Sequence, residues 1–137
     1  MKSRRGVMIV DSLGRRVAGG FNGAPHANLN GDLAFECDGS ERCRKLCAQR
    51  CVHAEMRALS ELRAELGETY RILHVKIGED GMVVPGGPPS CAECAKAILD
   101  AEHINGVWLC QVGALGEWRY YTRLEFYAET MKNLKLI

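Results

Sequence analysis

The sequence lacks both a long hydrophobic run and an excess of charge of one sign. Its longest apolar run near the start, Val7–Val10, is far too short for the core of a signal peptide or for a membrane span. Its 18 lysines and arginines nearly balance its 17 aspartates and glutamates, for a net charge of +1, and this balance argues against a strongly basic nucleic-acid-binding protein. We therefore expect a cytoplasmic protein that does not enter a membrane and does not have nucleic acid as its main partner.

The sequence also lacks internal repeats, low-complexity tracts and any linker that would separate two domains. A chain of 137 residues is close to the most common domain size and is long enough to bury a substantial core. With 47% hydrophobic and 26% charged residues, its composition is typical of a globular protein. We predict a single domain that covers residues 1–137.

Cysteine, by contrast, is abundant. Seven cysteines cannot all pair with one another in disulfides, and thiols in the cytosol are kept reduced. In such a protein, spaced cysteines are more often metal ligands or small buried side chains. The seven are Cys37, Cys43, Cys47, Cys51, Cys91, Cys94 and Cys110.

Hydrophobic periodicity predicts strands that alternate with helices. Apolar residues at spacings of three and four, among them Leu59, Leu62 and Leu66, indicate a first helix that ends before Gly67. This order of elements is typical of an α/β protein whose sheet contains parallel strand pairs and is covered by helices. The predicted strands are 6–11, 16–21, 71–77 and 106–112, and the predicted helices are 53–66, 91–102 and 122–134, with a long connection over 22–51.

Two of the predicted helices begin with metal-binding side chains. Cys91 and Cys94 are three positions apart, so they share one face of a helix, and the helix N-terminus favours their thiolate form. His53 adds an imidazole at the start of the other helix. Three protein ligands with an open fourth position are typical of a catalytic zinc site. The alternative is a pair of buried thiols and an ordinary histidine.

Glu55 follows His53 by two residues, which is too close for both side chains to bind one ion comfortably from a regular helix. Beside the metal, Glu55 would instead move protons to and from a water whose pKa zinc lowers to about 7. A carboxylate within hydrogen-bond reach typically accelerates such a reaction by about 10²- to 10⁴-fold. The alternative is an exposed acidic residue that stabilises the first turn of a helix.

Two motifs resemble the signature H-x-E and P-C-x-x-C of the zinc-dependent cytidine and deoxycytidylate deaminase superfamily: His-Ala-Glu at 53–55 and Pro-Ser-Cys-Ala-Glu-Cys at 89–94. The one departure is Ser90, which stands between the proline and the first cysteine. The resemblance implies a three-layer α-β-α fold with a mixed sheet, here without the helix that usually precedes the first strand, and a homo-oligomer. It also implies a zinc-dependent hydrolase, closest to the deoxycytidylate type, that converts deoxycytidylate to deoxyuridylate and releases ammonia.

A further segment, Gly-Phe-Asn-Gly-Ala-Pro at 20–25, resembles the G-Y-N-G-x-P segment of deoxycytidylate deaminases. The resemblance implies that Asn22 contacts a sugar hydroxyl of the substrate, and the alternative is an asparagine that favours a turn. The basic residue that often follows this segment in the family is missing here, so Trp118–Tyr121 is a candidate for phosphate recognition instead. The other residues that we predict to contact substrate are Gly23, Pro25, Ala54 and Ser90.

Several alternatives remain open on this reading. The substrate could also be a free base, a nucleoside, another nucleotide or a base in RNA, and the chain could be a zinc-binding module without activity. His74, His103 and Cys110 are interpreted as structural. Some relatives of the deoxycytidylate deaminases carry a structural zinc in the long connection, so its cysteines form either a second zinc site or reduced thiols without metal; they are Cys37, Cys43, Cys47 and Cys51.

Overall fold

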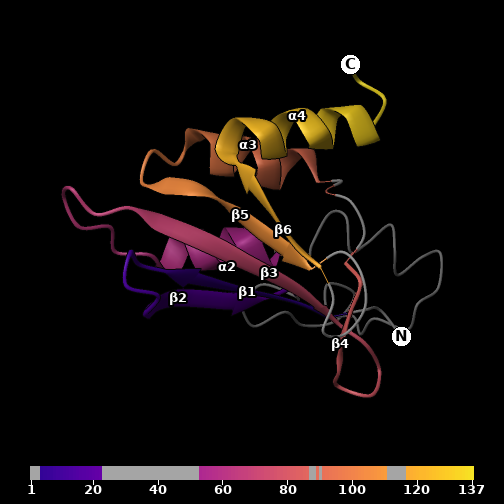
Figure 1. The fold of residues 1–137 in the computed structure, drawn as a ribbon, viewed down its shortest axis with the longest axis horizontal. Helices are drawn as coiled ribbons and strands as arrows, with labels where there is room; N and C mark the ends of the chain where they lie inside the picture. Colours follow the sequence, from indigo (N-terminus) through magenta and orange to yellow (C-terminus); the bar gives the residue numbers. More distant parts are fainter. Residues whose placement is uncertain (1–3, 23–52, 87–88, 90, 111–116) are drawn as a thin grey trace, which may run out of the picture.

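The computed structural model describes residues 4–22, 53–86, 89, 91–110 and 117–137, which form a sheet with helices (Figure 1). None of the helices in this described part of the chain is long and apolar enough to cross a membrane. The helices are α2 (Ala54–Glu61), α3 (Ala92–Asp100) and α4 (Arg123–Asn133). The strands are β1 (Arg4–Val10), β2 (Arg16–Phe21), β3 (Tyr70–Ile77), β4 (Val83–Val84), β5 (Ile104–Cys110) and β6 (Trp118–Thr122).

The six strands form one mixed sheet in the order β2-β1-β3-β5-β6, with β4 paired to the last residues of β3. β3 and β5 run parallel, and every other pair is antiparallel. The parallel pair is the one whose connection contains α3, as expected because parallel neighbours need a crossover. The predicted α/β class and mixed sheet are therefore confirmed.

The core lies on one face of this sheet. Alternate strand residues on that face are buried, and side chains from all three described helices pack onto them. Ala58 of α2, Ile98 of α3 and Phe126 of α4 belong to this core, and Phe126 meets Tyr121 of β6 edge to face with ring centroids 6.1 Å apart. The described part of the chain thus supplies the sheet and one of the two predicted helical layers.

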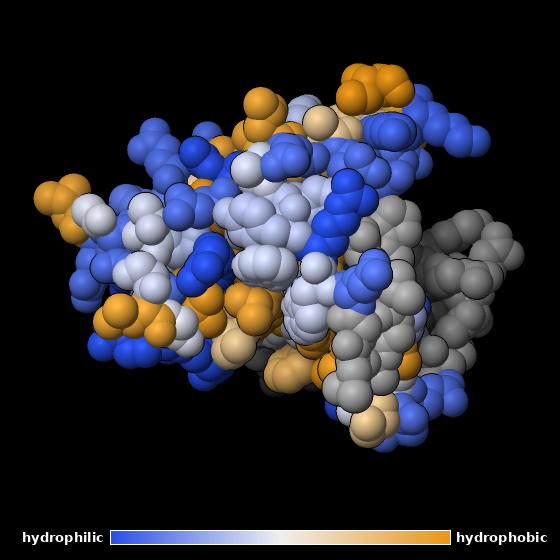
Figure 2. Space-filling model, in the orientation of Figure 1, coloured by the Kyte–Doolittle hydropathy of each residue, from blue (hydrophilic) through white to orange (hydrophobic). Residues whose placement is uncertain are grey.

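The opposite face of the sheet carries half-buried side chains that include Met8, Leu73 and Trp108. Because α2 lies behind β1 and β3 in Figure 1, this is the face turned toward the reader. In the space-filling view of Figure 2, hydrophobic side chains form small separate groups among hydrophilic ones. No broad apolar patch marks a subunit contact on this view, and homo-oligomerisation stays a prediction.

The first described helix is shorter than predicted. It ends at Glu61 instead of at residue 66, because Leu62 adopts an extended conformation with ψ at 128°. Leu62 still packs against the core, but Leu66 is fully exposed. Since the side chain of Leu66 buries no surface, nothing favours a further helical turn there. The prediction of helix over 62–66 is wrong for this reason.

A short edge strand, β6, precedes α4 and was not predicted. Its Tyr121 is buried in the core, and its Tyr120 contacts Trp108 of β5 with ring centroids 5.0 Å apart. α4 begins directly after β6 because Thr122 and Glu125 form a capping box, in which each side chain accepts a hydrogen bond from the other residue's backbone N–H. The candidate phosphate-binding segment, Trp118–Tyr121, is therefore part of the sheet.

A glycine allows α2 to approach the sheet closely. A Cβ atom on Gly20 of β2 would lie 2.7 Å from the Cβ of Arg57 and 3.1 Å from the carbonyl oxygen of Ala54. The backbones of β2 and α2 are thus in direct contact, which only a residue without a side chain permits. This contact sets how far the N-terminus of α2, and with it His53, lies from the sheet.

We expect Gly20→Ala to lower the free energy of unfolding by about 1–3 kcal/mol, because the added methyl group would push α2 away from β2. Urea denaturation followed by circular dichroism measures this loss. Gly19→Ala is the control. The two atoms closest to its Cβ belong to the mobile end of the Arg16 side chain, and one backbone atom, the carbonyl oxygen of Val7, lies at 3.1 Å, so its loss should be smaller. Equal losses in the two variants would contradict the packing argument.

Candidate metal centre and active site

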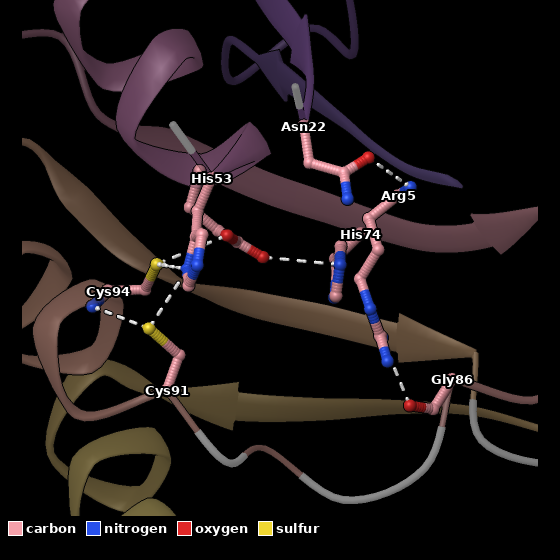
Figure 3. A network of polar contacts seen from close by, with 8 residues as sticks. Arg5, Asn22, His53, His74, Gly86, Cys91 and Cys94 are labelled. Atoms are coloured by element: carbon pink, nitrogen blue, oxygen red, sulfur yellow. Dashed lines mark hydrogen bonds and ion pairs between the residues drawn. The ribbon is translucent and has the colours of Figure 1, made fainter. Parts of the chain in front are cut away.

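Three potential metal ligands meet between the N-termini of α2 and α3 (Figure 3). His53 is the N-cap of α2, Cys91 is the N-cap of α3, and Cys94 lies in the first turn of α3. Nδ1 of His53 lies 3.1 Å from Sγ of Cys91 and 3.2 Å from Sγ of Cys94. All three donor atoms lie within 4.8 Å of one another. The two helix starts that the sequence predicted as ligand positions are therefore brought together.

The donor set fits a zinc ion. With Zn–N near 2.0 Å and Zn–S near 2.3 Å, tetrahedral coordination separates nitrogen and sulfur by about 3.5 Å, and the separations of 3.1 and 3.2 Å here are only slightly shorter. Imidazole and thiolate are ligands that suit zinc. Within the described ranges, this is the one group of His, Cys, Asp or Glu side chains close enough to hold a metal ion. Three donors leave one corner of a tetrahedron for solvent or substrate.

The pKa values of the two thiols are shifted in opposite directions. The hydrogen bond with the Cys94 side chain, followed by the one with His53, lowers the pKa of Cys91 to about 4. The same hydrogen bond with Cys91, together with burial and the charge of Glu55, raises the pKa of Cys94. These directions favour a thiolate on Cys91 and a thiol on Cys94, which donates its proton toward Glu55. A bound cation would displace that proton, since metal ligands must be deprotonated.

The carboxylate of Glu55 lies directly beside these donors. Glu55 is in the first turn of α2, and its side chain is 11% exposed. Oε2 accepts a hydrogen bond from Sγ of Cys94 at 3.3 Å. Burial against the metal ligands distinguishes Glu55 from an exposed acidic residue that only stabilises a helix terminus, which was the alternative interpretation.

A second histidine contacts the other oxygen of Glu55. Nε2 of His74 lies 3.2 Å from Oε1 of Glu55, within ion-pair distance but without the geometry of a hydrogen bond. Burial is the largest cause of a lowered pKa of His74; the charge of Glu55 acts against it and that of Arg5 acts with it. From the sequence, His74 was expected to be structural. Its alternation with Ile72 on a buried strand is the signal that could have placed it on the helical face.

Asn22 and Arg5 lie beside His74, on the side away from the two cysteines (Figure 3). The carboxamide oxygen of Asn22 accepts a hydrogen bond from the backbone N–H of Arg5 at 2.8 Å, and the Asn22 N–H donates to the Arg5 carbonyl at 3.2 Å. The guanidinium group of Arg5 donates to the carbonyl oxygen of Gly86 at 3.1 Å. These hydrogen bonds hold Asn22 against β1, and its contact with a sugar hydroxyl of the substrate stays a prediction.

The remaining predicted residues divide into two groups. Ala54 is buried in the core, and its contact with substrate stays a prediction. The others lie outside the described residues; they are Gly23, Pro25 and Ser90 among the candidate substrate contacts, and Cys37, Cys43, Cys47 and Cys51 of the candidate second zinc site.

Most of the chain matches a known protein family. Residues 1–110 match the family described as the cytidine and deoxycytidylate deaminase zinc-binding region. The matched range covers most of the chain and contains the three donors together with Glu55. Among curated proteins, no match to this chain is found.

Proposed function

The chain belongs to the cytidine and deoxycytidylate deaminase zinc-binding family, and on that premise we propose that it hydrolyses the amino group of a cytosine nucleotide, with deoxycytidylate as the preferred substrate. The observation that carries this proposal is the placement of Glu55. A purely structural zinc site needs no carboxylate, yet Glu55 is buried against the Cys94 thiol at 3.3 Å. His53, Cys91 and Cys94 would hold the zinc ion.

Zinc bound by these residues would supply a water of lowered pKa, near 7, as the nucleophile. Glu55 would accept one proton from the attacking water as the water oxygen bonds to C4 of the pyrimidine, and would pass that proton to ring N3. It then moves the remaining water proton to the exocyclic amine, which leaves as ammonia. Cytosine and water are thereby converted to uracil and ammonia with all atoms accounted for.

The buried position of Glu55 suits these transfers. C4 becomes tetrahedral during the reaction, and catalysis requires interactions that are stronger in that state than in the planar substrate. One oxygen of the Glu55 carboxylate contacts Cys94, and the other lies against His74. The orientation of the carboxylate is therefore fixed before the substrate binds. Such a carboxylate loses little freedom in the transition state.

Two positively charged side chains near the site support the proposal that the substrate carries a phosphate group. Arg5 and Lys76 are direct register partners on β1 and β3, and Lys76 follows His74 by two residues, so these side chains share the helical face of the sheet. Like charges directly opposite in a sheet repel each other. Lys76 has no ion pair among the described residues, and a phosphate group placed between the two cations would neutralise the repulsion.

We expect Lys76→Met to raise KM for deoxycytidylate by about 10-fold or more, because a charge-assisted contact with phosphate is lost. KM for deoxycytidine, which has no phosphate, should not change. Initial rates with both substrates measure the effect. Lys96→Met is the control, since Lys96 is an exposed lysine of α3 that pairs with Glu93. An equal change for nucleoside and nucleotide would exclude phosphate binding by Lys76.

The proposal as a whole is tested by following ammonia release from the zinc-loaded protein. Cytosine, cytidine, deoxycytidine, their mono- and triphosphates and a cytosine-containing oligonucleotide are compared at equal concentration. We expect the highest kcat/KM for deoxycytidylate. A preference for the oligonucleotide would reassign the substrate to nucleic acid. Absence of release from every substrate, with one zinc bound at His53, Cys91 and Cys94, would indicate a zinc-binding module without this activity.

A further inference from the structure

His74 occupies a position where an apolar residue would be expected. On β3 it follows Ile72, which is fully buried, and its register partners on the neighbouring strands are Val7 and Leu109. The side chain of His74 is only 11% exposed, and its Nε2 atom is completely buried. Burial of a polar atom without a partner is unfavourable, so packing alone does not account for a histidine here.

Within the part of the chain that the structure describes, the one polar side chain that Nε2 faces within ion-pair distance is Glu55, with Oε1 at 3.2 Å. α2 contributes this carboxylate to the contact and β1 contributes the charge of Arg5, whereas the cross-strand partners Val7 and Leu109 are uncharged. The 3.2 Å separation is short enough for a hydrogen bond, but the alignment is not yet that of one. Hydrogen bonds in active sites often align only when the metal and substrate are bound.

We propose that His74 is a positioning residue, which fixes the Glu55 carboxylate by donating a hydrogen bond from Nε2 to Oε1. Oε2 is then left on the side of the metal ligands, where it contacts Cys94 at 3.3 Å. The inference rests on the proposed function, because it assigns to His74 a role through the residue that moves the protons. His74 itself is assigned no contact with metal or substrate.

The surroundings favour the uncharged form of His74. Burial lowers its pKa, and although the charge of Glu55 opposes this change, the charge of Arg5 adds to it. A neutral imidazole carries its single proton on one nitrogen, and only the form with the proton on Nε2 can donate to a carboxylate at this position. The proposal therefore requires one particular tautomer of His74, which is observable directly.

Two substitutions separate positioning from packing. We expect His74→Leu to lower kcat by about 10- to 100-fold, the usual effect of removing a residue that orients a catalytic or metal-binding group, and to leave KM and bound zinc unchanged. His74→Gln keeps an N–H donor near the position of Nε2 and should recover most of the lost kcat. Val7→Ala, which truncates the apolar cross-strand partner of His74, is the packing control and should leave kcat unchanged. Failure of His74→Gln to recover activity when His74→Leu has lost it would overturn the proposal.

The closing experiment does not depend on turnover. Imidazole ¹⁵N shifts, recorded on the full chain with and without zinc and with Glu55→Gln as comparison, report which nitrogen of His74 carries the proton. We expect the Nε2–H tautomer at neutral pH, and a shift of its resonance in Glu55→Gln. A proton on Nδ1, or a spectrum insensitive to Glu55, would overturn the positioning role even in an active enzyme. If no cytosine substrate reacts but the Nε2–H tautomer responds to Glu55, the proposed function has failed and the contact stands.

Discussion

Glu55→Gln is expected to retain its zinc but to lose about 10³- to 10⁴-fold in kcat, the upper part of the range for general acid–base catalysis. The reason is that, in the proposed reaction, one carboxylate serves two proton transfers, first to ring N3 and then to the leaving amine. A glutamine has nearly the same shape and can contact Cys94 and His74, but it cannot accept a proton from water. Ammonia release and metal analysis of the same preparation measure the two quantities.

The control for this variant is Glu93→Gln. Glu93 lies in the first turn of α3 as Glu55 lies in the first turn of α2, but its side chain is 78% exposed and pairs with Lys96. Loss of its charge should leave kcat unchanged. If Glu55→Gln kept its turnover, the assignment of the proton transfers to Glu55 would be wrong. If it instead lost zinc, Glu55 would be needed for the metal site itself.

The sequence predicted those features of the site that depend on residues close together in the chain. Cys91 and Cys94 share a helix face because of their spacing, and His53 and Glu55 are fixed relative to each other by the first turn of α2. Each of these two pairs can be identified from its own spacing, without any contact to the rest of the chain. The meeting of the two pairs was inferred from the family resemblance, and the 3.1–3.2 Å separations between His53 and the two sulfurs agree with it.

The part that the sequence did not reveal depends on packing between distant segments. His74 reaches Glu55 only because α2 lies against β2 at Gly20 and because β1 aligns β3 in one register. Arg5 and Lys76 become neighbours through the same register. A single residue of slippage would turn His74 and Lys76 to the opposite face of the sheet. Periodicity shows that these positions alternate, but it does not show which side chain of a helix they will meet.

Element ends were also hard to predict where burial, and not spacing, decides them. The apolar repeat of the first helix continues to Leu66, but that side chain is fully exposed, so the helix ends at Glu61. β6 is held by its pairing with β5 and by the burial of Tyr121. Neither pairing nor burial is visible in the sequence of a short segment that follows Gly113 and Gly116.

Removal of one sulfur should abolish the metal site. We expect Cys91→Ala to bind one zinc fewer per chain than the wild-type protein and to lose deaminase activity by more than about 10³-fold. Two donors remain, and a catalytic zinc site needs three protein ligands. Inductively coupled plasma mass spectrometry measures the difference in zinc. The prediction concerns a loss of one zinc ion per chain relative to the wild-type protein. It therefore holds whether or not the cysteines at 37–51 bind a further ion.

The same substitution should separate metal binding from folding. Zinc that binds only the folded chain stabilises it by an amount that grows with the logarithm of its concentration, so added zinc should raise the Tm of the wild-type protein more than that of Cys91→Ala. Cys110→Ala is the control, because Cys110 is a buried thiol of β5 outside the donor group. It should lose stability through lost packing, yet keep its zinc and its response to zinc. A Cys91→Ala protein with wild-type zinc content and full activity would show that the ion, if any, is held elsewhere, and the assignment of Glu55 as its neighbour would then lose its basis.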